Sequence, residues 1–210
     1  MEAKFTISEV FKTSWQALKS QIWVLVGLYI GYVILAMIIN LLITPQLTSV
    51  IGITISYAIG LLLVSIFSLG YIKNMFQTLD GEEPQFSAYG QQASKVLTYL
   101  VAYVLFMIII SIGLLLVVLP GIYLILRLQF FGAFIVEENA GIIDCFKKSW
   151  AITKGQGMNL FILFLTMLGI GIVGVLLLIV GWFIAFPLIN IMQCYVFRKL
   201  NIPFQAIEEE

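Results

Sequence analysis

The fold is decided by the stretch from Val96 to Leu119, which reads VLTYLVAYVLFMIIISIGLLLVVL. None of its 24 residues is charged. As an α-helix the stretch would extend about 36 Å, which exceeds the roughly 30 Å hydrocarbon core of a bilayer. An uncharged helix of this length is typical of a membrane span, and the stretch therefore predicts one.

Three further uncharged runs are long enough to cross a membrane. They extend from Ile22 to Ile43, from Val50 to Ile72 and from Leu160 to Val180. The whole chain of 210 residues is 61% hydrophobic and only 10% charged, with a mean hydropathy of +1.08. Soluble domains carry roughly 25% charged residues. The sequence thus predicts an all-α integral membrane protein, forming a single membrane domain over residues 1–210.

Two shorter apolar runs, Ile122 to Val136 and Trp182 to Phe197, contain the polar residues Arg127, Asn190 and Gln193. We count both as spans because Pro120-Gly121 and Gly181-Trp182 each predict a tight reversal after the preceding long helix. The alternative is a pair of re-entrant segments. The preferred interpretation is six transmembrane helices arranged as three hairpins.

The distribution of charge predicts the orientation of the chain. The connections after the first, third and fifth spans carry no charge. Apart from Arg127, the charged residues lie at the N-terminus, at 73–95, at 137–154 or in the tail from 198 to 210. By the positive-inside rule this face is cytoplasmic, so both termini are expected in the cytoplasm.

An internal repeat accompanies the spans. Residues Phe11 to Gln21 read FKTSWQALKSQ, and Phe146 to Gln156, 135 residues later, read FKKSWAITKGQ, with six of eleven positions identical. Each copy precedes a long apolar run. The repeat unit is therefore predicted to be an amphipathic helix leading into a hairpin, with units at approximately 5–80, 83–138 and 141–200. The middle unit lacks the Phe-Lys-x-Ser-Trp pattern.

The repeated helices combine aromatic and basic residues on one side. Helical spacing places Lys12 and Lys19 beside Trp15, and Lys147 and Lys154 beside Trp150. This pattern is typical of a helix in the membrane interface, whose lysines reach toward lipid phosphates. The six residues are thus candidates for contact with anionic lipid. The alternative is that the aromatic side simply packs against the bundle.

The residue inventory argues against catalysis. Histidine is absent and there are two cysteines, Cys145 and Cys194, which we expect to be reduced thiols. The commonest general base and the usual metal ligands are therefore missing. We predict a protein that is not an enzyme and has no metal and no cofactor. A net charge of zero gives no support for a nucleic-acid partner.

Several motifs carry a resemblance. They are Gly81-Glu82-Glu83-Pro84-x-Phe86, Pro120-Gly121-Ile122-Tyr123-Leu124-x-x-Arg127, Glu138, and Phe146-Lys147-Lys148-Ser149-Trp150-x-x-Thr153-Lys154-Gly155. From roughly Gly70 onward the chain resembles uncharacterised prokaryotic six-span proteins, among them the membrane domain attached to some glycerophosphoryl diester phosphodiesterases. The resemblance implies a fold and a prokaryotic inner membrane. It implies no catalytic residue.

Two functions are considered from the sequence. The favoured one is an accessory or scaffold component that contacts anionic lipid, another membrane protein or a second copy through its interfacial helices. The alternative is a carrier of a small or lipid-like anion. In a straight fourth span Arg127 would lie roughly 15 Å from Glu137, too far to pair with it. We therefore expect Arg127 to face the bundle interior or a wet cavity, and to hydrogen-bond to carbonyls or to polar groups such as Asn190 and Gln193. An arginine that pins the short helices together and reaches toward the outer leaflet is favoured over an anion site. A membrane-depth cavity lined by Arg127, Asn190 and Gln193 would favour the carrier.

Overall fold

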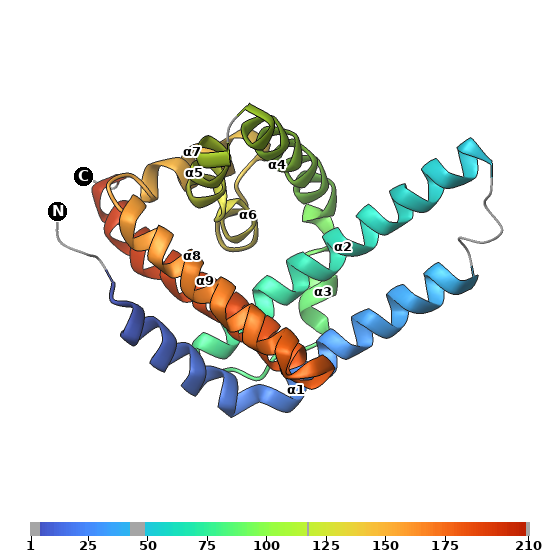
Figure 1. Ribbon diagram of the computed structural model, residues 1–210, viewed down its shortest axis with the longest axis horizontal. Helices are drawn as coiled ribbons and strands as arrows, with labels where there is room; N and C mark the ends of the chain where they lie inside the picture. The colour runs from blue at the N-terminus through green and yellow to red at the C-terminus, as the bar shows by residue number, and fades with distance from the viewer. Residues whose placement is uncertain (1–4, 43–48, 117, 209–210) are drawn as a thin grey trace.

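The computed structural model describes residues 5–42, 49–116 and 118–208, and no strand occurs within these ranges. Figure 1 shows the helices. Their bounds are α1 Ile7–Leu42, α2 Val50–Leu79, α3 Ser87–Gln91, η2 Ala93–Lys95 (a 3-10 turn), α4 Val96–Leu116, α5 Val118–Leu128, α6 Phe131–Glu138, α7 Ile142–Ile152, α8 Gly157–Leu176 and α9 Leu178–Glu208.

Within the described ranges, six segments are long and apolar enough to cross a membrane, which confirms the predicted all-α, six-span class. They form a first hairpin of α1 and α2, a second of α4 with α5 and α6, and a third of α8 and α9. In Figure 1 the first hairpin extends to the right, and α8 and α9 run side by side diagonally below the centre. The hairpins therefore point in different directions around a common centre.

The two copies of the repeated sequence end differently. In the second copy α7 ends at Ile152, and Gly155 follows with a φ of +79°, which a glycine adopts easily. The equivalent residue in the first copy is Ser20, and there α1 continues as one helix that bends at Gln21, where φ is −130° and ψ is 21°. The bend separates the amphipathic residues 7–20 from the apolar span, as the sequence predicted.

The short helices connect the hairpins into a ring. α3 contacts α2, and α7 contacts α5 and α6, in each case the second arm of the preceding hairpin. The long helix α1 contacts α9, the second arm of the third hairpin. At the start of α1, the Glu9 carboxylate accepts a hydrogen bond of 2.7 Å from the Tyr195 hydroxyl and pairs with Lys199 at 2.8 Å. The first and last helices therefore close the ring.

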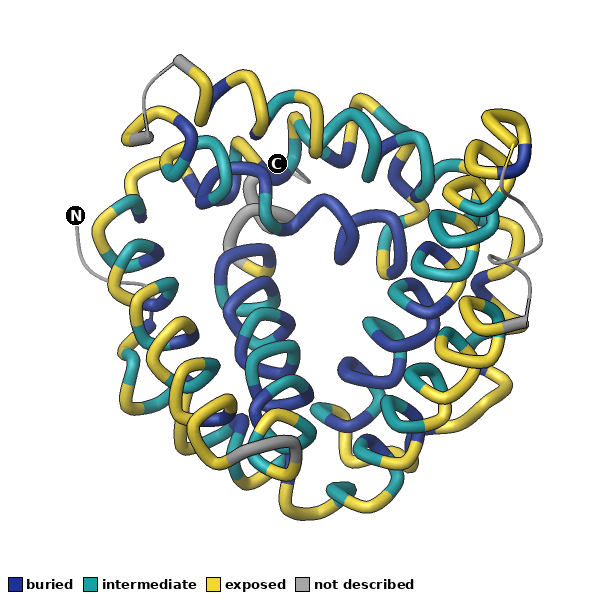
Figure 2. The backbone as a smooth tube through the Cα atoms, turned by 45° about the vertical axis from the view of Figure 1, so that its right-hand side comes forward, coloured by how far each residue is buried: buried dark blue, intermediate teal, exposed yellow. Residues whose placement is uncertain are grey.

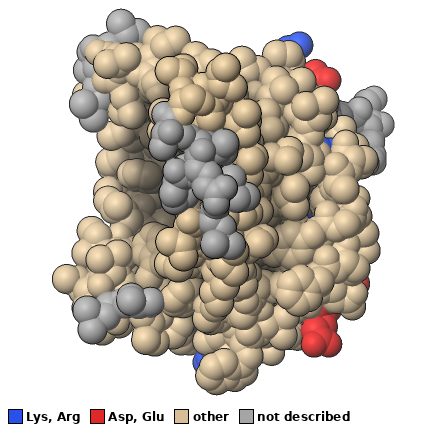
Figure 3. All heavy atoms as spheres, turned by 90° about the vertical axis from the view of Figure 1, so that its right-hand side faces the viewer, with Lys and Arg blue, Asp and Glu red and all other residues tan. Residues whose placement is uncertain are grey.

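Ion pairs join the charged ends of the hairpins. Glu137 at the end of α6 pairs with Lys73 of α2 at 3.4 Å and with Arg198 of α9 at 3.8 Å, and Arg198 also pairs with Asp80. In Figure 3, where the tip of the first hairpin faces the viewer, charged atoms lie only at the margin. These four charged residues thus lie where the charged ends of the three hairpins meet.

The predicted reversals at Pro120-Gly121 and Gly181-Trp182 need correction. α5 already begins at Val118 and α9 at Leu178, so all four residues lie in the first turns of these helices. Proline is tolerated there because the first N–H groups of a helix have no partner within it. Gly121 allows close helix contact instead, since a Cβ atom there would lie 2.5 Å from Cδ2 of Leu114.

The two short spans adopt different structures. The sixth is one continuous helix, α9, from Leu178 to Glu208. The fourth is broken: α5 ends at Leu128, and α6 begins at Phe131. All residues of α6 from Phe131 to Val136 are buried. Figure 2 shows the general pattern, with buried residues on the inner sides of the helices and exposed residues on the outer sides.

Two glycines of α8 provide a test of the third hairpin. A Cβ atom at Gly174 would lie 2.7 Å from the Cβ of Ala185, whereas one at Gly169 would have no neighbour within 4 Å. Both substitutions by alanine gain up to about 1 kcal/mol of helix propensity, but overpacking costs about 1–3 kcal/mol. Gly174→Ala should therefore lower the melting temperature in detergent, and Gly169→Ala should not. Equal melting temperatures would contradict this packing.

Candidate functional site

The break in the fourth span is held together by α7. The Ser149 hydroxyl accepts a hydrogen bond of 3.2 Å from the Phe130 N–H and donates one of 2.8 Å to the Arg127 carbonyl. The Thr153 hydroxyl lies 3.4 Å from the same carbonyl. Within a membrane, backbone groups released by a helix break need such partners. Ser149 thus satisfies backbone groups on both sides of the break.

The Arg127 side chain lies against the same helix. The guanidinium carbon is 4.3 Å from the centre of the Trp150 ring and 5.8 Å from that of Tyr123. These two rings meet edge to face at 5.8 Å. Arg127 is only 5% exposed, and its Nε has no hydrogen-bond partner among the described residues. The structure thus brings together two of the motifs that carried the family resemblance, the one that ends at Arg127 and the one that contains Trp150.

Arg127, Asn190 and Gln193 do not form one site. The Asn190 amide donates to the Phe186 carbonyl at 2.8 Å. The Gln193 amide donates to the Gln129 carbonyl at 3.5 Å and to the Gln129 side-chain oxygen at 3.4 Å. Arg127 has no hydrogen bond to either amide, so this one of the expected alternatives does not form.

A cavity of about 970 Å³ lies between the three hairpins. Twelve of its lining residues are aromatic: Tyr29, Tyr32, Phe67, Tyr71, Tyr99, Tyr103, Phe106, Phe130, Phe131, Phe164, Trp182 and Phe186. Its polar lining includes Ser68, Gln129, Asn190 and Gln193. No charged residue is among those that line it, and Arg127 is therefore outside it. The cavity combines a wide apolar wall with a few neutral polar groups.

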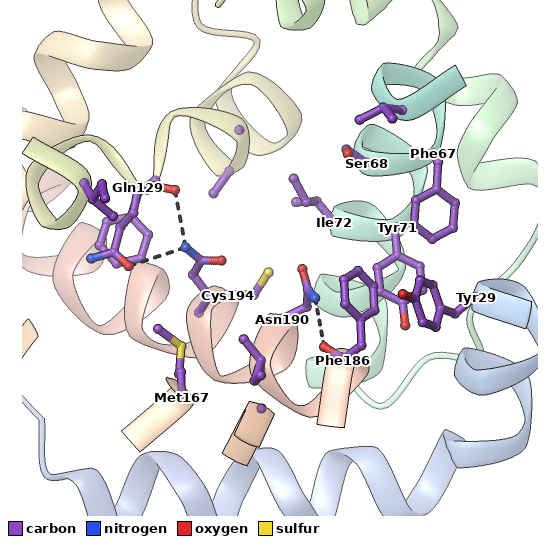
Figure 4. Close-up of a pocket in the computed structure, with 18 of the residues that line it drawn as sticks. Tyr29, Phe67, Ser68, Tyr71, Ile72, Gln129, Met167, Phe186, Asn190 and Cys194 are labelled. Carbon is purple, nitrogen blue, oxygen red and sulfur yellow. Dashed lines mark hydrogen bonds between the residues drawn. The ribbon is translucent and has the colours of Figure 1, made fainter. Parts of the chain in front are cut away.

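The side chains labelled in Figure 4 line the cavity from several directions. Figure 4 shows Gln129 on one side, Tyr29 and Tyr71 on the other, and Asn190 and Cys194 between them. On the aromatic side, the Tyr29 and Phe186 rings are stacked with their centres 4.0 Å apart. The Trp182 N–H donates a hydrogen bond of 3.0 Å to the Tyr29 hydroxyl, which links the first and third hairpins.

The four interfacial lysines, Lys12, Lys19, Lys147 and Lys154, are exposed and form no ion pair among the described residues. The two tryptophans beside them have different neighbours. Trp15 stacks on Phe11 at 6.3 Å with the Lys19 ammonium 5.8 Å from its ring, whereas Trp150 contacts Arg127. The two repeated helices are therefore alike in their lysines but not in their aromatic contacts.

Both cysteines are free and buried, as expected for reduced thiols. In α7, burial raises the pKa of the Cys145 thiol to about 12, so that it is protonated at neutral pH. A buried, protonated thiol is a poor nucleophile.

Sequence reasoning missed Ser149 and Thr153 as structural groups. Their spacing of four residues places both hydroxyls on one side of α7, and this pattern could have indicated a polar contact with a neighbouring helix. No sequence pattern predicted the aromatic cavity, because the rings that line it come from all three hairpins.

A family assignment covers this region. The profile of a domain of unknown function, DUF7847, matches residues 85–207. The chain belongs to the DUF7847 family. The match begins just before α3 and includes the broken span, Arg127 and α7. No curated protein and no solved structure matches the chain. The resemblance to phosphodiesterase membrane domains stays a prediction.

The repeat supplies a matched pair of variants for the helix break. Ser149→Ala should destabilise this DUF7847 protein by about 1–3 kcal/mol, because the Phe130 N–H loses its partner. Ser14 is the equivalent residue in α1, and its buried hydroxyl has no partner among the described residues. Ser14→Ala should therefore leave the melting temperature unchanged or raise it. If the two variants melt alike, Ser149 does not hold the break.

Proposed function

We propose that this DUF7847 protein is a non-enzymatic membrane protein that binds a lipid-like molecule in the cavity between its three hairpins. The observation that carries the proposal is the lining of that cavity. Ligand sites are typically 300–1,000 Å³ and largely apolar, with a few polar groups that fix orientation. A cavity of about 970 Å³ with twelve aromatic residues and three amide side chains has these properties.

The lining also defines the chemistry of the ligand. A charged group buried without a partner is strongly disfavoured, and the lining residues include none that could neutralise it. The ligand is therefore a neutral molecule, or a lipid whose charged part stays outside the cavity. Its polar group would contact Gln129 and Gln193, and its apolar part would contact the aromatic wall. This argues against a small anion moving through the cavity.

The proposal includes a location and an orientation. The protein would lie in a prokaryotic inner membrane with both termini in the cytoplasm. The loop lysines all belong to the segments predicted to be cytoplasmic, which supports this orientation. The absence of histidine from the chain supports a role other than catalysis.

A cavity-filling variant tests the proposal. Gly171 lines the cavity, and a Cβ atom there would make ordinary contacts of 3.9 Å with Ile189 and Trp182. Gly171→Leu should therefore reduce, by at least severalfold, the lipid-like material that native mass spectrometry detects on the purified protein. Gly169→Leu is the matched control, since position 169 faces open space. Equal retention in both variants would refute cavity binding.

A second candidate function rests on the exposed lysines beside Trp15 and Trp150. We propose that the interfacial helices bind anionic lipid, through which the protein would act as an accessory or scaffold component for a partner membrane protein or a second copy. Each basic residue near an anionic surface contributes about 1 kcal/mol, screened by salt.

Charge removal tests this second candidate. Lys12, Lys19, Lys147 and Lys154 are all exposed, so replacing them together by glutamine should leave the fold intact. The variant should retain clearly less phosphatidylglycerol than the wild type after extraction in mild detergent. At high salt the difference in retained phosphatidylglycerol between wild type and variant should become smaller, because salt screens the attraction in the wild type. Unchanged phosphatidylglycerol in the variant would leave only helix packing as the role of these helices.

A further inference from the structure

The strongest unassigned feature outside the cavity is the cation at Arg127. Arg127 is only 5% exposed, and its guanidinium lies near the rings of Trp150 and Tyr123. It forms no ion pair among the described residues. Its Nε hydrogen has no acceptor there. A buried cation without a counter-charge is costly, and aromatic faces compensate only part of that cost.

Two more cations lie near Trp150 in the sequence, one within α7 and one just after it. Lys147 is three residues before Trp150, a spacing that places both on one side of α7. Lys154 follows in the turn after the helix ends at Ile152. Both lysines are exposed, and Trp150 is 41% exposed. Two exposed lysines therefore flank, in the sequence, a tryptophan whose ring contacts a buried guanidinium.

The opposing charge on this helix is small. Asp144 is the acidic residue of α7 and is exposed one turn before Lys147. Arg127, Lys147 and Lys154 therefore outnumber the single carboxylate of α7. Guanidinium groups suit phosphate because their donors match its oxygens, and exposed lysines add long-range attraction.

We propose that Arg127, Trp150, Lys147 and Lys154 form one binding site for the phosphate of an anionic lipid headgroup. The phosphate binds the Arg127 guanidinium at the edge of the Trp150 ring, and the two lysines attract it to that position. This inference rests on the second candidate function and makes it specific: α7 has a defined site, whereas α1 has lysines without a buried arginine. We assign the phosphate to a lipid because Arg127 belongs to the fourth membrane span and Trp150 to the interfacial helix α7.

The Trp150 ring provides a direct readout. Replacing Trp15, Trp23 and Trp182 by phenylalanine leaves Trp150 as the single tryptophan. In mild detergent, this protein is titrated with short-chain phosphatidylglycerol, short-chain phosphatidylcholine or inorganic phosphate. Phosphatidylglycerol should change the Trp150 emission in a saturable way. Its saturating concentration should be at least tenfold lower than that of phosphatidylcholine or inorganic phosphate. Equal responses to both lipids would overturn the site, and an equal response to inorganic phosphate would overturn the assignment to a lipid.

Variants separate this site from a general basic surface. Arg127→Gln should abolish the saturable response, and Lys147→Gln and Lys154→Gln should each weaken it about fivefold, the equivalent of the usual contribution of one basic residue. Because Arg127→Gln could unfold the protein, the two exposed lysines provide the deciding measurement in that case. Replacing Lys12 and Lys19 should leave the response unchanged. If replacing Lys12 and Lys19 weakens the Trp150 response as much as replacing Lys147 and Lys154 does, the specific site is refuted. Only the general lipid contact of the second candidate function would then remain.

Discussion

The architecture depends on the two hydrogen bonds of the Ser149 hydroxyl to the backbone of the broken fourth span. A helix inside a bilayer normally satisfies its own backbone groups, and a break leaves some of them without partners where no water can replace them. Ser149 accepts from the Phe130 N–H and donates to the Arg127 carbonyl, so the chain can change direction there. Without this hydroxyl, the break would leave polar groups unsatisfied in an apolar environment.

The break has consequences for both candidate sites. It allows α6 to be buried against α2, α4 and α7, and it brings Gln129 and Phe131 to the cavity wall. It also leaves Arg127 beside Trp150 instead of in the cavity. One local interaction thus separates a neutral, aromatic cavity from a cationic site at α7. The two sites therefore differ in charge.

The sequence predicted the features that depend on composition. Runs such as Val96 to Leu119 have only one stable structure in a membrane, and the repeated Phe-Lys-x-Ser-Trp pattern indicated the helices before the first and third hairpins. The reversal at Pro120-Gly121 was misplaced, because proline fits the first turn of a helix as well as a turn.

The break itself could not be predicted from local sequence. Residues 128–131 read LQFF, without a proline or glycine, and the partner that stabilises the break follows about twenty residues later in α7. The contact of Arg127 with Trp150 was not predicted for the same reason, since Trp150 belongs to α7. The cavity depends on the directions of all three hairpins, and apolar periodicity within one helix contains no such information.

The central claim is that the fourth segment crosses the membrane despite its break. Single cysteines at Ser49, Gln91 and Gly141, all exposed, can be introduced after Cys145 and Cys194 are replaced by alanine; Gln46, in the same connection as Ser49, lies outside the described residues. Labelling with an impermeant thiol reagent, in right-side-out and inverted vesicles, reports the side of each position. Gln91 and Gly141 should label from the same side and Ser49 from the other. Labelling of Gly141 from the side of Ser49 would show that the broken segment does not cross and would contradict the account.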